Sequence, residues 1–505
     1  MGSGEGCVRR STTPRGLVVA ALLAAALALA AAPPARANQL VEITIPTRHA
    51  QISDAWLRYP GPPRARVLLP DGYDPAKRYP LLVLLAGAMS NYKTWSGTGS
   101  GRIQTTAAGF PGIIVMPEGA TGFYTDWWNG GRRGGPSWET YILEDVLPAV
   151  LARYPIRAER RWHALAGVSM GGLGTAYLGG RLPGFFGSIA LISGVPDLQL
   201  FPGMANLAAL VPQGTAAQPI DGYQIYGAPD GFYAQGHYPL RLAANLQHTR
   251  VFMASGDGTP TSDGEPNGNN VLTDLAAEVA LVRPGSDHYA QALAAAGVDV
   301  TYQPHEGIHD FANFRRELRD AIAWDLFAPV AERPTSWVND TVATRGRLWQ
   351  FGYRFDAPPD RIVRFRRSGG RLSVSAAGSP VTLTTDDGCR LRIATPGTIA
   401  VPTAPCAKPP APAVAKPTVR VRPGRLSTGR WRTVRVVVSP APAGTTVRVG
   451  GRRASTDDRG VAFLPLCAAD RRGVRIAVAT PGRPGVRVRV RAHGPARGCP
   501  AGRGA

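Results

Sequence analysis

The stretch WHALAGVSMGGLGTA, residues 162–176, decides how this chain folds. Residues 162–166 have the short apolar pattern of a buried β-strand, and residues 172–176 open a helical pattern. Between them, Gly167-Val168-Ser169-Met170-Gly171 matches G-x-S-x-G, a pattern in which a serine stands on a sharp turn from strand to helix. Small neighbours are needed there, because bulky side chains would collide with the flanking strand and helix. The stretch therefore predicts that Ser169 is a nucleophile.

Short apolar runs alternate with helical patterns on both sides of this stretch, over residues 38–332. Such alternation is typical of a mostly parallel sheet covered by helices on both faces, and with the serine turn it predicts a doubly wound α/β-hydrolase domain. Strands are expected at 79–85, 112–116, 162–167, 188–192, 250–254 and 298–303. Helices are expected at 138–153, 172–180, 288–296 and 313–326, the last with a polar face that includes Arg315, Arg316, Glu317, Arg319 and Asp320.

After residue 333 the pattern changes to β-type alternation with Gly and Pro turns. We expect a small β module at 333–406, an extended Pro/Ala/Lys linker at 407–417 and a basic β-sandwich-like module at 418–505. In the last module valines alternate with arginines, as in Val-Arg-Val-Arg-Val-Arg at 486–491. This spacing favours a half-buried sheet whose outer face carries arginines.

The first 37 residues have the features of an export signal. Arg9, Arg10 and Arg15 precede an apolar run at 16–32, and Ala35-Arg36-Ala37 offers a small-x-small cleavage site. A membrane anchor is the alternative, although the run is short for a hydrocarbon layer of about 30 Å. We therefore expect a secreted or cell-envelope protein on the extracellular side of the membrane.

Cysteine usage agrees with export. Four cysteines follow the signal, an even number typical of exported chains: Cys389, Cys406, Cys467 and Cys499. Two local disulfides are expected rather than a metal site, because no C-x-x-C pair or flanking histidine is present. No phosphate loop or dinucleotide fingerprint stands out either, so no cofactor and no metal is expected.

The formal net charge of +22 is concentrated in the tail. Residues 407–505 contain 21 Lys and Arg against three Asp, while residues 38–406 are close to neutral. A basic tail of this kind could hold an anionic cell-envelope polymer. No nucleic-acid-binding motif accompanies the charge, so nucleic acid is not expected as a partner, and a solvated outer face of the β module would also explain the arginines.

A serine hydroxyl is a poor nucleophile until a base takes its proton, so a histidine must follow near the carboxyl edge of the sheet. His309 lies in Glu-Gly-Ile-His-Asp, after the expected strand at 298–303 and before the last helix. It is the predicted base. Surface or structural roles are expected for the other histidines that follow the serine: His237, His248, His288 and His305.

The acid that orients this histidine should fall between nucleophile and base in the chain. Asp257 comes directly after an expected strand, and Glu278 is the second candidate. General topology favours Asp257, but position alone leaves both open. Two backbone donors are also needed for the oxyanion: Met170 N–H at the helix start, and Ala88 N–H in the loop after residues 81–85, where Gly87 lets the backbone approach closely.

These residues together resemble the esterase family that includes the antigen 85 mycolyltransferases, over about residues 57–327. The matching stretches are YPLLVLL at 79–85, GFYTDWW at 122–128, SWET at 137–140, GVSMG at 167–171, GDGTP at 256–260 and GIH at 307–309. The glutamate of that family precedes a helix and an A-A-G-V turn, and Glu278 stands at this place. The resemblance therefore implies a triad of Ser169, Glu278 and His309, in preference to Asp257.

One departure bears on the substrate. Mycolyltransferases carry an Asp and an Arg in the oxyanion loop to handle trehalose, where this chain has Ala86 and Met89. The leading hypothesis is an exported serine esterase that cleaves an acyl ester through an acyl-enzyme. The alternatives are a mycolyltransferase-like acyltransferase, which passes the acyl group to a sugar or lipid hydroxyl, and an envelope-binding protein that acts through its basic tail.

Overall fold

The computed structural model describes residues 1–2, 37–47, 49, 61–133, 136–200, 225–261, 271–403, 406, 417–439, 445–457, 460–480 and 485–500. Nearly all of the predicted export signal and of the predicted linker lies outside these ranges. The chain divides into two compact units, Met1–Pro405 and Cys406–Ala505. Among the described residues, no helix has the length and apolar character needed to cross a membrane.

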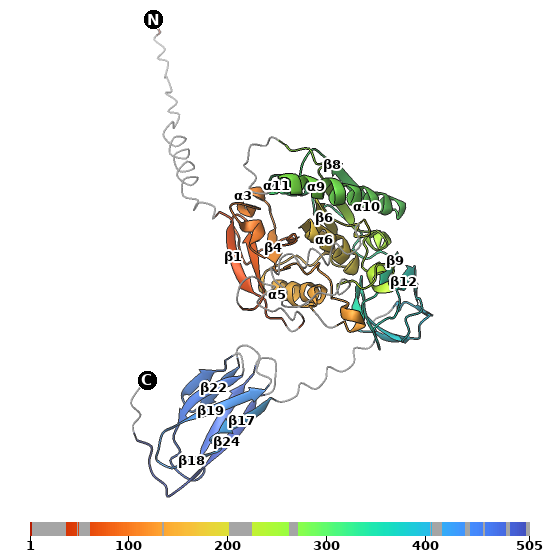
Figure 1. The fold of residues 1–505 in the computed structure, drawn as a ribbon. Coiled ribbons are helices and arrows are strands. Elements are labelled where there is room, and N and C mark those ends of the chain that lie inside the picture. Colours follow the sequence, from red (N-terminus) through yellow and green to blue (C-terminus); the bar gives the residue numbers. More distant parts are fainter. Residues whose placement is uncertain are drawn as a thin grey trace. The chain divides into compact units, whose positions relative to one another are not determined.

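The first unit is built on a sheet that, among the described residues, has eight strands in the order β1-β2-β4-β3-β5-β6-β7-β8 (Figure 1). The strands are β1 (Gln39–Thr44), β2 (Arg64–Leu69), β3 (Leu81–Leu85), β4 (Ile113–Pro117), β5 (His163–Val168), β6 (Ser188–Ile192), β7 (Arg250–Ser255) and β8 (Val300–Pro304). All pairs from β4 to β8 are parallel, whereas β2 pairs antiparallel with both β1 and β4. The predicted mostly parallel α/β-hydrolase sheet is confirmed.

Helices cover both faces of this sheet. They are α3 (Ile103–Thr106), α4 (Trp138–Thr140), α5 (Leu147–Arg153), α6 (Met170–Arg181), α8 (Phe232–Gln235), α9 (Val271–Ala277), α10 (Arg283–Ala295) and α11 (Phe311–Ala323). Successive strand residues point to opposite faces, so Leu81 and Val83 pack with α5, α6 and α10, while Leu82 and Leu84 pack with α3 and α11. Two apolar cores therefore hold the layers together.

The predicted polar face of the last helix is wrong at two positions. Glu317 in α11 is completely buried, and only 8% of Arg315 is exposed. Glu317 lies at helical spacing from the buried Phe314 and Leu318, so it faces the sheet with them. Arg315 reaches across to donate a hydrogen bond of 2.6 Å to the Ser100 carbonyl oxygen.

Residues 336–400 form two further four-stranded sheets that enclose a core of their own. One sheet, in the order β10-β11-β14-β15, consists of β10 (Arg345–Leu348), β11 (Phe351–Phe355), β14 (Val381–Thr385) and β15 (Arg390–Ile393). The other, in the order β16-β13-β12-β9, consists of β16 (Gly397–Ala400), β13 (Arg371–Val374), β12 (Val363–Ser368) and β9 (Ser336–Thr341). We call these two sheets the β module.

The second unit contains two sheets in its described part, in the orders β17-β19-β22 and β18-β24-β23-β20-β21. Its strands are β17 (Thr418–Arg422), β18 (Arg425–Ser427), β19 (Arg432–Ser439), β20 (Thr446–Val449), β21 (Arg452–Ser455), β22 (Val461–Leu466), β23 (Val474–Ala479) and β24 (Val486–His493). Arginines of β24 are exposed between less exposed valines, the expected alternation. Cys467 and Cys499 form a disulfide, and Cys389 and Cys406 are disulfide-bonded as well, so both predicted disulfides are present.

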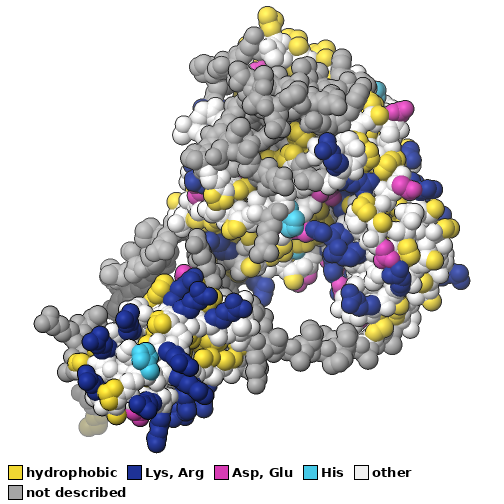
Figure 2. Space-filling view, turned by 60° about the horizontal axis from the view of Figure 1, so that its bottom comes forward, with side chains coloured by type: hydrophobic (Ala, Val, Ile, Leu, Met, Phe, Trp, Pro, Cys, Tyr) yellow, Lys and Arg dark blue, Asp and Glu magenta, His cyan; other side chains and the backbone are white. Residues whose placement is uncertain are grey.

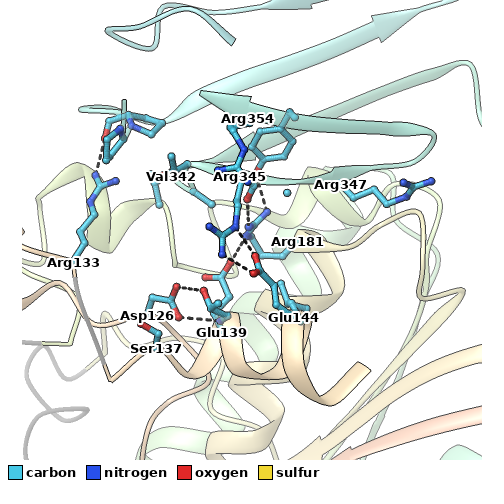
Figure 3. Close-up of a pocket in the computed structure, with 18 of the residues that line it drawn as sticks. Asp126, Arg133, Ser137, Glu139, Glu144, Arg181, Val342, Arg345, Arg347 and Arg354 are labelled. Carbon is cyan, nitrogen blue, oxygen red and sulfur yellow. Dashed lines mark hydrogen bonds and ion pairs between the residues drawn. The ribbon is translucent and has the colours of Figure 1, made fainter. Parts of the chain in front are cut away.

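Arg181, at the end of α6, joins the β module to the central sheet. Its guanidinium is buried and donates to Glu139 Oε1 at 2.7 Å, to the Tyr353 hydroxyl at 3.0 Å and to the Arg345 carbonyl oxygen at 3.3 Å (Figure 3). Glu139 belongs to α4, whereas Tyr353 and Arg345 belong to the β module. One buried cation at the end of α6 thus bonds to α4 and to two strands of the β module.

We expect Arg181→Ala to lower the free energy of unfolding of the first unit by about 3–5 kcal/mol, because it leaves the Glu139 carboxylate buried without its partner. Urea unfolding followed by tryptophan fluorescence measures the change. The control is Arg392→Ala, which breaks an exposed pair with Asp356 and should cost less than about 1 kcal/mol. Equal losses in the two variants would contradict this account of the junction.

Candidate active site

Ser169 stands on the turn from β5 to α6 with backbone angles of φ 55° and ψ −119°. A non-glycine residue seldom adopts this conformation, so the surroundings must enforce it. The neighbouring glycines permit the turn: a Cβ on Gly171 would lie 2.7 Å from the Ala86 carbonyl oxygen, and one on Gly172 would lie 2.5 Å from the Gly194 Cα. The serine is therefore held at the carboxyl end of β5 in a strained turn, with its side chain only partly buried.

The same edge of the sheet carries the other polar groups of the site. Parallel strands end at one edge, and Ser193, Gly256 and His309 follow the carboxyl ends of β6, β7 and β8. His309 lies in the loop between β8 and α11, and its ring meets the ring of Phe314 edge-on at a centroid distance of 4.9 Å. Ser169 and His309 are thus on one edge, three strands apart in the sheet order.

Glu278 connects these strand ends. It opens a π-helical turn, η7 (Glu278–Val282), and is completely buried. Its Oε2 lies 2.9 Å from His309 Nδ1. Its Oε1 accepts a hydrogen bond of 2.6 Å from Gly256 N–H and lies 3.1 Å from Ser193 Oγ. A carboxylate bound in this way fixes the ring of His309 and leaves Nε2 as the free nitrogen of the imidazole.

Asp257, the other acid considered from the sequence, lies elsewhere. Its side chain is exposed and accepts a hydrogen bond of 2.8 Å from Thr259 N–H, and this bond lowers the pKa of the carboxyl. Among the described residues it makes no hydrogen bond with a histidine. Asp257 therefore stabilises the turn in which it lies, and Glu278 is the carboxylate that contacts His309.

No hydrogen bond joins Ser169 and His309 in the described part of the chain. Both side chains are partly exposed. Contacts between a nucleophile and its base are often long in enzymes without substrate and tighten when substrate binds. The structure thus places Glu278 and His309 in contact, without a hydrogen bond from either of them to the Ser169 hydroxyl among the described residues.

The loop after β3 lies directly against Ser169. A Cβ on Gly87 would stand 3.4 Å from Ser169 Cβ, so the backbone passes the serine at close range. Ala88, next in this loop, is partly exposed, and Met170 begins α6. Neither Ala88 N–H nor Met170 N–H donates to another described residue, so both are available to a ligand.

A second carboxylate beside Glu278 was not expected from the sequence. Glu317 Oε1 lies 2.8 Å from Ser193 Oγ and 2.7 Å from His305 Nε2, so Ser193 stands between two buried carboxylates. A hydroxyl has one proton to donate and can satisfy only one of them. The helical spacing of residues 314, 317 and 318 was the available signal for the burial of Glu317.

Burial raises the pKa of Glu317 to about 7, and the charge of Glu278 adds to the effect, while hydrogen bonds from His305 and Ser193 oppose it. Burial alone would lower the pKa of His305, but the hydrogen bond with Glu317 raises it overall. A group whose pKa is raised by folding stabilises the fold at low pH and loses that contribution as pH rises through the shifted value. Both groups therefore stabilise the folded state at low pH, and the contribution of Glu317 is lost as the pH rises from its ordinary pKa of 4.5 to about 7.

The remaining predicted non-catalytic histidines have structural partners. His237 is buried among aromatic rings, and burial lowers its pKa to about 4. His248 Nε2 lies 2.7 Å from the Ser336 carbonyl oxygen. His288 Nδ1 lies 2.9 Å from Asp197 Oδ2, with the imidazole largely exposed.

We expect Glu317→Gln to change how stability depends on pH. The melting temperature of the variant relative to wild type should rise between pH 5.5 and pH 8.5, on the order of a few degrees, because the wild type alone ionises a buried carboxyl over this range. Differential scanning calorimetry measures the difference. Glu306→Gln, an exposed neighbour, should give an offset that does not vary with pH. If the melting temperature of Glu317→Gln also differed from that of wild type by a constant amount at every pH, the raised pKa of Glu317 would be contradicted.

Comparison with known proteins adds to this geometry. The "Esterase" family model matches residues 58–324, more than half of the 505-residue chain. Esterase Rv1288 of Mycobacterium tuberculosis is 30% identical over 287 residues, which cover 54% of this chain and 57% of that protein. An endo-1,4-beta-xylanase/feruloyl esterase of Xylanibacter ruminicola is 30% identical over 140 residues, covering 26% of this chain and 19% of that protein. The chain thus spans little more than half the length of its mycobacterial relative.

Solved structures of similar fold include a ferulic acid esterase, with 20% identity and a TM-score of 0.39, covering 57% of this chain and 98% of that one. MPT51 of Mycobacterium tuberculosis matches with 18% identity and a TM-score of 0.43, covering 59% and 99%. The match over residues 58–324 decides the assignment, and it confirms the family expected from the sequence. This chain belongs to the esterase family.

Proposed function

We propose that this protein is an exported serine esterase in which Ser169 is the nucleophile, His309 the base and Glu278 the acid that orients the base. Membership of the esterase family gives the class of reaction, the hydrolysis of esters. The observation that carries the residue roles is the 2.9 Å contact between Glu278 and His309, on the sheet edge where the strained Ser169 turn also lies. If Glu278 and His309 formed only a structural pair, the fold would not need to hold a serine in a strained backbone conformation on the same edge of the sheet.

In the proposed reaction, His309 Nε2 takes the proton of Ser169 Oγ as this oxygen attacks the ester carbonyl carbon. The carbonyl oxygen becomes negatively charged and accepts hydrogen bonds from Met170 N–H and Ala88 N–H. His309 then gives its proton to the leaving alcohol, which departs as the acyl-enzyme forms. Water, deprotonated by His309, cleaves the acyl-enzyme and restores Ser169. Glu278 stabilises the imidazolium in both halves of the cycle.

Water is the proposed acceptor in preference to a sugar hydroxyl. The positions at which mycolyltransferases carry an Asp and an Arg are Ala86, which is buried, and Met89, of which 55% is exposed. Neither side chain can hydrogen-bond a sugar hydroxyl. Transfer to an alcohol would need another acceptor site that competes with water, so acyl transfer remains the second candidate.

The basic second unit supports a second proposal, attachment to an anionic polymer of the cell envelope. Figure 2 shows Lys and Arg side chains spread over the visible face of this unit. Arg487, Arg489 and Arg491 are exposed on β24, and none forms an ion pair with a described residue. Unpaired surface cations attract polyanions at low ionic strength.

We expect Ser169→Ala to abolish covalent labelling by a fluorophosphonate probe and to lower kcat on a p-nitrophenyl ester by at least about 10³-fold. Glu278→Gln should keep the fold and lower kcat by about 10²- to 10⁴-fold, because the base loses its orienting charge. Asp257→Asn is the matched control and should stay within about twofold of wild type. Full labelling of the Ser169→Ala variant, or a larger loss in Asp257→Asn than in Glu278→Gln, would refute the proposed roles.

Deletion of residues 407–505 tests the role of the second unit. The shortened protein should hydrolyse a soluble ester at the wild-type rate, because the proposed triad lies wholly in the first unit. Its retention on a column of anionic polymer at low salt should fall, since it loses 18 net positive charges. Unchanged retention would show that the tail is not the attachment site.

A further inference from the structure

A second cleft lies between the helical layer of the central sheet and the β module (Figure 3). Its volume is about 1250 Å³, and none of Ser169, Glu278 and His309 lines it. Pockets for single small molecules usually measure about 300–1,000 Å³ and often lie between domains. This cleft therefore has room for several linked rings, and it is separate from the proposed active site.

One wall of the cleft is the outer face of the sheet β10-β11-β14-β15. Paired residues of antiparallel strands point to the same face, so the register defines what this wall presents. Two neighbouring rows cross the strands: Arg345, Arg354 and Thr382 in the first, and Arg347, Gly352, Thr384 and Arg390 in the second. Short residues thus occupy the middle of the wall, and arginines surround them.

The opposite wall carries aromatic and hydroxyl groups. Trp128 is partly exposed, and its ring lies 4.9 Å from that of Tyr233, with the guanidinium of Arg133 at 5.1 Å from the Tyr233 ring. Ser137 and Thr140 line the cleft beside them. Figure 3 shows Arg133 at one end of the cleft and Arg347 at the other. Flat aromatic faces flanked by hydroxyls suit the apolar faces and hydroxyls of sugar rings.

Positive charge exceeds negative charge along the cleft. Seven arginines line it against four carboxylates, those of Asp126, Glu139, Glu144 and Asp360. Arg181 pairs with Glu139, and Arg345 pairs with Glu144 at 2.5 Å. Arg347 pairs with Asp386, which lies outside the lining, and the arginines without an ion pair would favour a ligand of opposite charge.

Three of the cleft arginines carry that surplus: Arg132, Arg354 and Arg390. Each is exposed, and none makes an ion pair with any residue that the structure describes. Arg132 comes from the wall of the central sheet, while the other two come from the β module. A guanidinium binds a carboxylate or a phosphate through two parallel hydrogen bonds, so these groups are suited to anionic substituents.

We propose that this cleft binds an anionic oligosaccharide, with its carboxylate or phosphate groups on Arg132, Arg354 and Arg390 and a sugar ring against Trp128. A lone inorganic anion would fill little of the volume and would leave the aromatic wall unused. A neutral glycan would leave the three guanidiniums unpaired. The proposal goes beyond the esterase reaction, because it concerns a different cavity and does not depend on which ester Ser169 attacks.

Isothermal titration calorimetry on the full chain tests the proposal with three probes. Hexagalacturonate supplies carboxylates, a phosphorylated mannohexaose supplies phosphates, and maltohexaose is the neutral control. We expect binding of at least one anionic probe and at least tenfold weaker binding of maltohexaose. The anionic probe that binds more tightly identifies which substituent the arginines recognise.

Charge-matched variants separate the cleft from positive charge elsewhere on the first unit. Arg354→Ala with Arg390→Ala should weaken binding of the anionic probe at least tenfold. Arg366→Ala with Arg371→Ala removes the same charge from exposed positions of β12 and β13 that do not line the cleft, and it should change binding less than twofold. Arg132→Ala, on the opposite wall, should weaken binding as well, and it provides a second test if the double variant melts at a lower temperature than wild type. Equal losses in the two double variants, equal affinity for maltohexaose, or no binding of either anionic probe would overturn the proposal.

Discussion

The strained turn at Ser169 is the constraint on which the rest of the first unit depends. A serine at φ 55° and ψ −119° persists only if its neighbours cannot relax, and close approaches on both sides prevent relaxation. Because Gly171 has no side chain, α6 can pack closely against the end of β3. In the same way, Gly172 allows α6 to pack against Gly194, which follows β6. The turn therefore fixes helix, loop and two strand ends at once. This is why glycines cluster in the stretch that first indicated the fold.

Glu278 holds together the loops that follow β6, β7 and β8 at the same edge of the sheet. Its carboxylate is completely buried, which would be unfavourable without partners, and it gains them from Ser193, Gly256 and His309. The second buried carboxylate, Glu317, shares Ser193 with it. Two ionised carboxylates so close together would repel each other, and the raised pKa of Glu317 reflects this as well as its burial.

Much of this architecture could be predicted from residue patterns in the sequence. The elements and site residues that were not predicted were missed for physical reasons. Fully buried strands such as β6 appear as continuous apolar runs, so their limits were predicted closely. The antiparallel strands β1 and β2 mix polar and apolar residues, unlike the continuous apolar runs of the parallel strands, and were not predicted. Position in the sequence did not distinguish Asp257 from Glu278 as the candidate acid. The family resemblance favoured Glu278, which contacts His309 in the structure. The roles of Ser193 and Glu317 arise from packing across the sheet, which no local pattern records.

The cleft could not be predicted from local sequence patterns either. One helix, α6, runs from Ser169 to this cleft. Its arginines come from separate strands and become neighbours only through the pairing register of β10, β11, β14 and β15. Yet α6 begins beside Ser169 and ends at Arg181, the buried cation that lies in the cleft and holds the β module. Twelve residues of helix span about 18 Å. Because a packed helix is rigid, an anionic glycan held in the cleft would stay at a fixed distance from the serine.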